Sequence, residues 1–404
     1  MQRNTSRIAI LLLLLATLTT KKIHAQWDIE DSNTTASLRG IHNVGRGVAW
    51  ASGTNGTVLR TEDGGYLWQT CNIPPGAEKL DFRGIQAFDE NTAIVMSSGP
   101  GDQSRLYKTT DGCQTWKLLF TNPDKEGFFD ALSLNAPKRD ALGRPLKSSH
   151  GWGYVLGDPV GGIFRLFSTN DGGETWHQRL ATERGAKGEG CKIDDFKAKR
   201  DEAAFAASNQ SLLALNGDYL LFVTGGSEAR LLYNDVFSLD GSLCHESIHF
   251  LKLPLASGRS SSGAFAAATP PDYRDRGNRP DKLVIVGGDY SHSGDEAGTA
   301  VTVVSVGIPF RQSAKAAQTP PHGYRSSVAY DPQQKLWITV GPNGTDISTD
   351  DGKNWTPLKP SGYDPPDADK NWNALSLPFV VGPHGRIGRL RTITQKPEQP
   401  PTHP

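Results

Sequence analysis

Short apolar segments recur along the chain, and each is followed by a glycine turn and another run of strand-forming residues. Seven such segments begin at Ala49, Val95, Tyr154, Leu221, Val284, Trp337 and Phe379. A short apolar run bounded by glycine is typical of a buried β-strand and its turn. The repeat of about 50 residues, in a β-rich chain, indicates a propeller built from four-stranded blades. The pattern therefore predicts an all-β fold with seven blades.

A second pattern occurs four times, after the predicted strands of blades one, two, three and six. It consists of a Ser or Thr, an Asp two places later, a glycine, and a Trp seven places after the hydroxyl residue. Its members are Asp63 with Trp68, Asp111 with Trp116, Asp171 with Trp176, and Asp350 with Trp355. We expect a tight turn in which the Asp accepts backbone N–H groups, glycine adopts a positive φ and Trp fills the space beside the hairpin. The role predicted for these residues is structural.

The seventh blade lacks an outer strand at the C-terminal end of the repeats. In every copy of this second pattern, which is called a box from here on, the Trp opens the predicted outer strand. Trp27 stands near the start of the chain. We therefore expect the segment beginning at Trp27 to complete blade seven, which removes the exposed edges of an open ring. Residues 26–393 then form a single propeller domain.

The chain ends carry their own signals. Two arginines precede an apolar run from Ile8 to Leu18, and Ala25 ends a short polar stretch. This pattern predicts a cleaved signal peptide over residues 1–25 and a periplasmic or secreted protein. The apolar run is too short for a comfortable membrane span, so none is expected after cleavage. Residues 394–404, rich in Pro and polar groups, are predicted to be disordered.

The composition narrows the chemistry. The chain has 43 basic and 43 acidic residues, so its formal net charge of zero argues against nucleic acid or an anionic membrane as partner. The segment 346–352 is similar to a calcium loop but lacks the Gly and distal Glu of one. Four irregularly spaced cysteines, Cys71, Cys113, Cys191 and Cys244, leave three disulfide connectivities open, and unpaired or partly paired thiols are slightly favoured. We predict neither a metal nor a cofactor.

Residues 53–65 and 341–352 resemble the repeats of the photosystem II stability/assembly factor-like family, whose propellers carry BNR or Asp-box repeats. The resemblance extends from Leu38 to Leu390. It implies an exported seven-bladed propeller of WD40/YVTN-like type. In the photosynthetic members it also implies a chaperone-like role in the assembly of a membrane complex.

The strand order places the candidate site on the face opposite the Asp-boxes. The start of each innermost strand and the turn between the second and third strands share one face. Arg39, Arg83 and Arg325 are expected at matching places near the channel, and Asp130 starts the innermost strand of blade three. The glycine turns add further candidates to the same rim, namely Asp158, Asp289, Tyr290 and His384.

Arginines at a channel mouth suit a carboxylate or another anionic group, because a guanidinium can form two parallel hydrogen bonds with it. The alternative is that each Arg pairs with an Asp and staples the blades together. We predict a monomeric binding or assembly platform for a protein partner, or for an anionic or glycan ligand, at this rim.

The competing prediction is a sialidase-like glycoside hydrolase at the same rim. Tyr290 or Tyr324 with Asp130 or Asp158 could be nominated, but the sequence offers no convincing Glu partner for either Tyr and no Arg-Ile-Pro segment. No motif of a serine hydrolase, a zinc protease or a phosphate-binding loop is present either. Catalytic residues therefore stay unassigned.

Overall fold

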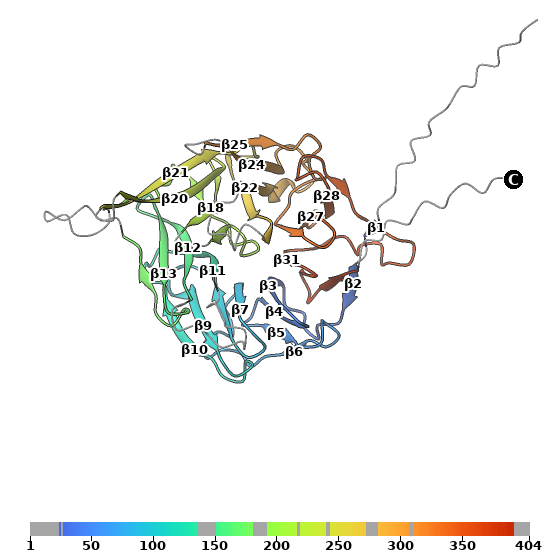
Figure 1. Ribbon diagram of the computed structural model, residues 1–404. Coiled ribbons are helices and arrows are strands. Elements are labelled where there is room, and N and C mark those ends of the chain that lie inside the picture. The colour runs from blue at the N-terminus through green and yellow to red at the C-terminus, as the bar shows by residue number, and fades with distance from the viewer. Residues whose placement is uncertain are drawn as a thin grey trace, which may run out of the picture.

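Seven sheets are arranged around a central axis in the computed structural model (Figure 1). The structure describes residues 24–25, 27–135, 151–180, 192–215, 219–239, 243–271, 282–306 and 311–391. The predicted disordered tail, and all but residues 24 and 25 of the predicted signal peptide, lie outside the described residues. The predicted seven-bladed, all-β propeller is confirmed.

The first three blades follow one another as four-stranded antiparallel sheets. Blade one contains β3 (Leu38–Gly45), β4 (Val48–Gly53), β5 (Val58–Thr61) and β6 (Gln69–Thr70). Blade two contains β7 (Phe82–Ala87), β8 (Ala93–Ser97), the 3-10 helix η1 (Gly101–Gln103), β9 (Arg105–Thr109) and β10 (Lys117–Thr121). Blade three contains β11 (Phe129–Leu134), β12 (Gly153–Val160), β13 (Ile163–Thr169) and β14 (His177–Gln178).

Blades four and five are extended by short additional strands. Blade four contains β17 (Leu212–Ala214), β18 (Leu220–Val223), β20 (Arg230–Leu239), β21 (Leu243–Lys252) and, parallel to β21, β15 (Lys192–Ile193). Blade five contains β22 (Arg259–Ala268), β23 (Lys282–Asp289), the 3-10 helix η2 (Tyr290–His292), β24 (Ala300–Val306) and β25 (Arg311–Ala316). On its inner side lie β19 (Gly225–Gly226) and β16 (Glu202–Ala203).

The last two blades complete the ring. Blade six contains β26 (Ser327–Asp331), β27 (Leu336–Gly341), β28 (Gly344–Ser348) and β29 (Thr356–Pro357). Blade seven contains β31 (Ala374–Ser376), β32 (Phe379–Val381), β33 (Ile387–Leu390) and β2 (Trp27–Glu30). A separate parallel pair joins β1 (His24–Ala25) to β30 (Lys359–Pro360).

The N-terminal strand closes the ring as predicted. β2 pairs antiparallel with β33, with Trp27 opposite Leu390, so the blue strand lies beside the red ones in Figure 1. Trp27 is buried, its ring centroid lies 6.0 Å from that of Trp372, and its Nε1 donates to Thr345 Oγ1 at 3.2 Å.

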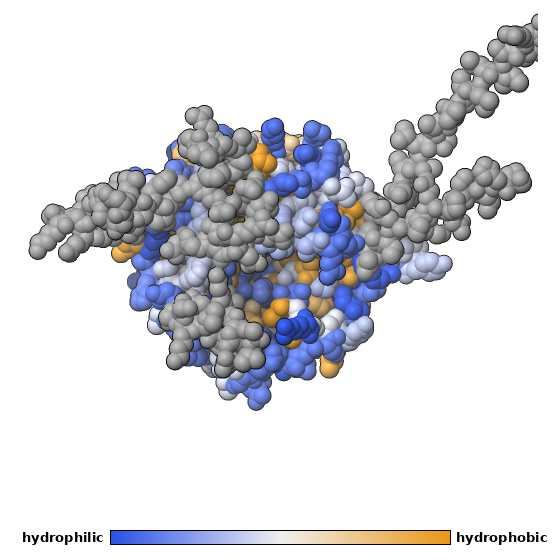
Figure 2. All heavy atoms as spheres, in the orientation of Figure 1, coloured by the Kyte–Doolittle hydropathy of each residue, from blue (hydrophilic) through white to orange (hydrophobic). Residues whose placement is uncertain are grey.

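The seven apolar segments of the sequence become the second strands of the seven blades. In β8, β18 and β27 every residue is buried, because neighbouring blades cover both faces of each inner strand. The core lies between the blades; one cluster joins Leu38 and Ala51 of blade one to Phe379 and Val381 of blade seven. Figure 2 shows one face of the ring, with hydrophilic residues over most of its rim and hydrophobic residues gathered nearer its centre.

The four box turns share one set of hydrogen bonds. In the first, Thr61 Oγ1 donates to Asp63 Oδ1 at 2.8 Å, Asp63 Oδ1 accepts from the Leu67 N–H at 3.0 Å, and Gly65 has a φ of 97°. The same bonds recur at Asp111, Asp171 and Asp350. The four box tryptophans Trp68, Trp116, Trp176 and Trp355 are buried. The Gly64 N–H donates to Gly47 O in the β3–β4 turn, which places the boxes at the end of the blade away from the start of β3.

One disulfide links blades one and two. Cys71 follows β6 and Cys113 lies in the box turn of blade two, with their Cα atoms 5.4 Å apart. This bridge excludes four unpaired thiols and is compatible with the partly paired alternative. A single connectivity remains for a second bridge, between Cys191 and Cys244, whose side chains lie outside the described part of the chain.

A segment of the chain occupies the central channel. Residues 203–210, here called the channel plug, run from β16 into the middle of the ring (Figure 1). Gln210 accepts hydrogen bonds from the Ser327 hydroxyl and the Val328 N–H and donates to Leu375 O, and Asn209 Oδ1 accepts from the Leu132 N–H. The plug therefore bonds to blades three, six and seven. The sequence analysis did not predict it.

Candidate binding site at the channel mouth

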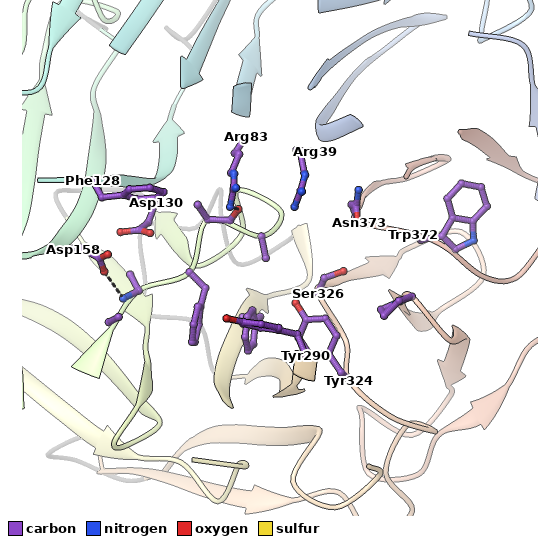
Figure 3. A pocket seen from close by; sticks show the side chains of 17 residues that line it. Arg39, Arg83, Phe128, Asp130, Asp158, Tyr290, Tyr324, Ser326, Trp372 and Asn373 are labelled. Carbon is purple, nitrogen blue, oxygen red and sulfur yellow. Dashed lines mark hydrogen bonds between the residues drawn. The ribbon is translucent and has the colours of Figure 1, made fainter. Parts of the chain in front are cut away.

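A cavity of about 490 Å³ opens at the mouth of the channel where the innermost strands begin (Figure 3). The plug supplies five of the lining residues, Ala203 to Ala207. The blades and their turns supply the rest: Arg39, Arg83, Phe128, Asp130, Asp158, Phe265, Tyr290, Tyr324, Ser326, Pro342, Trp372 and Asn373. The cavity thus joins a largely apolar wall to a few ionisable groups, as small-molecule and peptide sites do.

β-Bulges bring several of these side chains into the cavity. The register of the innermost strand shifts at Arg39 in blade one, Arg83 in blade two, Asp130 in blade three and Phe265 in blade five. A bulge leaves one residue out of the ladder and redirects its side chain. All four bulge residues line the cavity.

The arginine expected in blade six lies one residue away from this position. Regular pairing starts at Gly40 in blade one and at Ser327 in blade six, so Ser326, and not Arg325, corresponds to Arg39. The prediction that Arg325 matches Arg39 and Arg83 was therefore wrong by one residue. A shift of one residue turns a side chain to the other side of a strand.

Arg325 is fully buried within blade six. It forms a salt bridge with Asp346, and its Nη1 donates to Asn343 Oδ1 at 2.8 Å. Asp346 Oδ1 also lies 2.7 Å from His322 Nδ1. For this arginine the stapling alternative describes the observed contacts, although the staple joins segments of a single blade.

The remaining two arginines differ in their partners. Arg83 Nε lies 2.7 Å from Asp81 Oδ2, and its Nη1 donates to Ala206 O at 3.4 Å. Arg39 Nε is buried and has no hydrogen-bond partner in the part of the chain that the structure describes. Burial lowers the pKa of Arg39, and the positive charge of Arg83 lowers it further. Both guanidinium groups point into the same space in Figure 3.

Two carboxyl groups form the neighbouring wall. Asp130 is fully buried, and its Oδ2 has no partner. Burial raises the pKa of Asp130 well above its usual value, and the nearby Asp158 adds to the shift. Burial raises the pKa of Asp158 to about 6, although its Oδ1 accepts a hydrogen bond from the Ala204 N–H at 3.1 Å.

Aromatic rings form the opposite wall. Phe205 of the plug stacks on Phe265, with ring centroids 3.9 Å apart and planes 9° apart. Tyr324 meets Phe265 edge-on at 4.8 Å, and the half-exposed Tyr290 lies 6.3 Å from Tyr324. Burial raises the pKa of Tyr324, so its hydroxyl stays protonated.

Two other expected rim residues do not line this cavity. Asp289 lines a different hollow, where Arg259 Nη1 lies 3.0 Å from its Oδ2. Burial alone would raise the pKa of Asp289, but hydrogen bonds from Ser261 and Arg259 lower it to about 2. His384 lines a third hollow beside Arg386 in blade seven.

Phe205, Phe265 and Ser326 line the cavity but were not predicted from the sequence. Phe265 lies at the register shift between Ala264 and Ala266, and Ser326 directly precedes the first paired residue of β26, so both places depend on strand register, which the sequence pattern does not specify. Nothing in the sequence pattern indicated that Phe205 would reach the channel. Among the described residues, no group of His, Cys, Asp or Glu side chains could hold a metal ion.

No family model matches the chain. Over 160 residues it is 28% identical to the photosystem II assembly lipoprotein Ycf48 of Synechococcus sp. (strain CC9902). The chain is similar to a photosystem II assembly factor. The aligned region is 40% of this chain and 42% of Ycf48, so the match spans less than half of either protein.

Solved structures extend the likeness in fold. The structure described as YCF48 bound to D1 peptide aligns with 93% of this chain and 99% of its own, with a TM-score of 0.53 and 16% identity. YCF48 from Cyanidioschyzon merolae aligns with a TM-score of 0.48 and 15% identity, over 91% of this chain and 98% of its own. The first of these shares the propeller fold. Among the described residues, no helix is long and apolar enough to cross a membrane.

Proposed function

We propose that this propeller is an exported binding platform that holds a segment of a protein partner in the cavity at the channel mouth. The observation that carries the proposal is the half-buried Arg39 guanidinium, which lines that cavity and whose buried Nε has no hydrogen-bond partner among the described residues. A buried charged donor left unbonded costs free energy, so a ligand that completes its hydrogen bonds is stabilised there.

The walls fit a peptide segment. Arg83 already forms a salt bridge with Asp81. The Arg39 guanidinium is therefore left to donate hydrogen bonds to an anionic group of the partner. The rings of Phe205, Phe265 and Tyr324 supply the apolar contact that such a segment needs. The likeness to an assembly factor, and to a solved propeller that holds a D1 peptide, supports a protein partner.

The disulfide bond is consistent with export from the cytoplasm. Disulfides persist in oxidising compartments, and Cys71 is bonded to Cys113. The signal-peptide pattern of residues 1–25 points the same way. We therefore place the protein in the periplasm or outside the cell.

No specific observation favours the glycoside hydrolase. The third arginine of a sialidase-like triad is absent from the cavity, because Arg325 is buried against Asp346. No glutamate is among the described residues that line the cavity, so neither Tyr290 nor Tyr324 has the partner that a tyrosine nucleophile requires.

The proposal predicts that Arg39→Met abolishes partner capture. The purified mature protein would be immobilised and exposed to an envelope extract, and bound proteins quantified by mass spectrometry. Removing a central, desolvated guanidinium should reduce recovery of a stoichiometric partner at least about tenfold. Arg46→Met is the matched control, since Arg46 is an exposed arginine at the opposite end of β3.

Undiminished capture by the correctly folded Arg39→Met protein would contradict the proposal. Thermal unfolding of both variants establishes folding. A panel of fluorogenic glycosides assayed with the same samples tests the hydrolase directly, because turnover lost in Asp130→Asn would support it.

A further inference from the structure

The two carboxyl groups of the cavity have no function in simple anion binding. Asp130 is the bulge residue of β11, and Asp158 lies at the register shift of β12 between Gly157 and Pro159. Both face the space into which Arg39 and Arg83 point (Figure 3). Two ionised carboxylates beside a bound anion would repel it. Their presence next to an unpartnered arginine therefore needs an explanation.

Asp130 has no dedicated cation. The ionisable groups that face it from the strands packed against β11 are Arg83 of β7 and Asp158 of β12, while β8 and β17 contain none. The plug residues 203–207 contain none either. Arg83 is already held by Asp81. A fully buried carboxyl in this setting favours its neutral form, which is a hydrogen-bond donor.

With both carboxyls protonated, donors converge on the cavity. They are the Arg39 guanidinium, the acid O–H groups of Asp130 and Asp158, and the Tyr324 hydroxyl, with the half-exposed Tyr290 at the edge. The charge of the cavity is then positive, because Asp81 offsets only one of the two arginines. With both carboxyls ionised, the charge becomes negative, and an anion is disfavoured.

We propose that the cavity binds a carboxylate carried on an aromatic or similarly flat apolar group, and that a proton enters with it onto the Asp130–Asp158 pair. The proton comes from solvent and no covalent bond changes. The carboxylate lies on Arg39, and the apolar group lies on the wall of Phe205, Phe265 and Tyr324. This inference rests on the proposed function, since it specifies the chemistry of the segment that the same cavity receives.

The direction of the pH dependence follows from the proton. The pKa of Asp158 is raised to about 6, so the free site loses the proton as pH rises through that value. Above it, each pH unit should weaken binding of the carboxylate about tenfold, because each complex must first recover a proton.

The test uses 3-phenylpropionate as probe and the full mature protein. Calorimetric titrations at about pH 5.5 and about pH 8, in two buffers of different ionisation enthalpy, give both affinity and proton uptake. We expect the dissociation constant to rise more than about tenfold at the higher pH, with about one proton taken up per ligand near neutrality. Asp158→Asn should keep the acceptor for the Ala204 N–H but flatten the pH dependence of binding. Asp102→Asn, at an exposed carboxylate, is the control and should leave that pH dependence unchanged.

Three results would overturn the inference. The first is tighter binding of phenethylamine at the higher pH, which would make the carboxyl pair an ammonium site. The second is Arg39-dependent binding of 3-phenylpropionate with no proton uptake; the proposed function would survive that result. The third is no binding of 3-phenylpropionate at either pH, in which case the partner-capture experiment still decides the proposed function by itself.

Discussion

In six blades one residue of the inner region reaches the channel mouth, either at the register shift of the innermost strand or directly before its first pair. Arg39, Arg83, Asp130, Phe265, Ser326 and Asn373 occupy this place. In blades one, two, three and five this residue lies at a bulge, so its side chain is free of the ladder; in blades six and seven it directly precedes the first paired residue. The chemistry of the cavity is therefore set by one position repeated around the ring, and the blades can change it independently.

The residue just before that position is buried, and in blade six it is charged. Asp346→Asn should remove the anion from Arg325 and leave a buried guanidinium without its countercharge. We expect a loss of about 3–5 kcal/mol in the free energy of unfolding, measured by denaturant titration against Arg46→Met. A loss below about 1 kcal/mol would show that the pair contributes little.

The pH dependence of this loss has a defined sign. Burial alone would raise the pKa of Asp346, but His322 and Arg325 lower it below its usual value in the folded state. A carboxyl whose pKa is lowered on folding stabilises the protein above its unfolded pKa, and the contribution disappears as the pH falls. The difference between wild type and Asp346→Asn should therefore shrink in acid, and a constant difference would contradict this assignment.

Sequence patterns predicted strand existence well and strand register less well. The apolar runs and the Gly-bounded turns located the second strand of each blade. The side of the strand on which Arg325 lies changes when the register shifts by one residue. A bulge is not encoded by hydrophobic alternation, because the extra residue is defined by its partner strand. Arg39 and Arg83 line the cavity at the mouth, whereas Arg325 is buried within blade six.

At the scale of elements, the plug changes what the channel can do. It fills the channel between the mouth cavity and a second hollow lined by Ser208, Asn209 and Gln210. It starts beside a buried ion pair between Glu202 and Arg230. The plug residues therefore form the floor of the mouth cavity.

The plug could not be predicted because its sequence carries no period. The sequence of residues 203–210 is Ala-Ala-Phe-Ala-Ala-Ser-Asn-Gln. Such a run is compatible with a loop, a short strand or a helix. Its conformation is decided by distant partners in three blades. Tertiary contacts of this kind leave no local signal.

Gln210→Ala tests how far the plug contributes to the fold. The change leaves the Val328 N–H and the Ser327 hydroxyl without their acceptor in the interior. We expect a loss of about 1–3 kcal/mol of unfolding free energy. Gln114→Ala, at an exposed glutamine in a box turn, is the control and should change stability by less than about 0.5 kcal/mol. Equal effects of the two substitutions would mean that the plug is not anchored through Gln210.

At the scale of the molecule, the ring is closed by non-covalent contacts between the two ends of the propeller. β2 supplies the outer strand of blade seven, and the core clusters lie between blades, so each blade depends on its neighbours. The sequence predicted this closure because Trp27 matches the Trp that opens the other outer strands. The Cys71–Cys113 bridge ties two neighbouring blades but does not span the closure.

Removal of the closing strand should therefore destabilise the whole ring. Deletion of residues 26–32 exposes the edge of β33 and the buried face of Trp372, and leaves Thr345 Oγ1 without the Trp27 indole donor. We expect a lower midpoint of thermal unfolding, measured by circular dichroism, and concentration-dependent aggregation, measured by light scattering.

Trp27→Ala, which keeps the strand, should lower the free energy of unfolding by about 3–5 kcal/mol through the lost packing alone. Deletion of residues 394–404 is the matched control for shortening the chain. An unchanged unfolding midpoint after deletion of residues 26–32 would show that blade seven is stable with three strands.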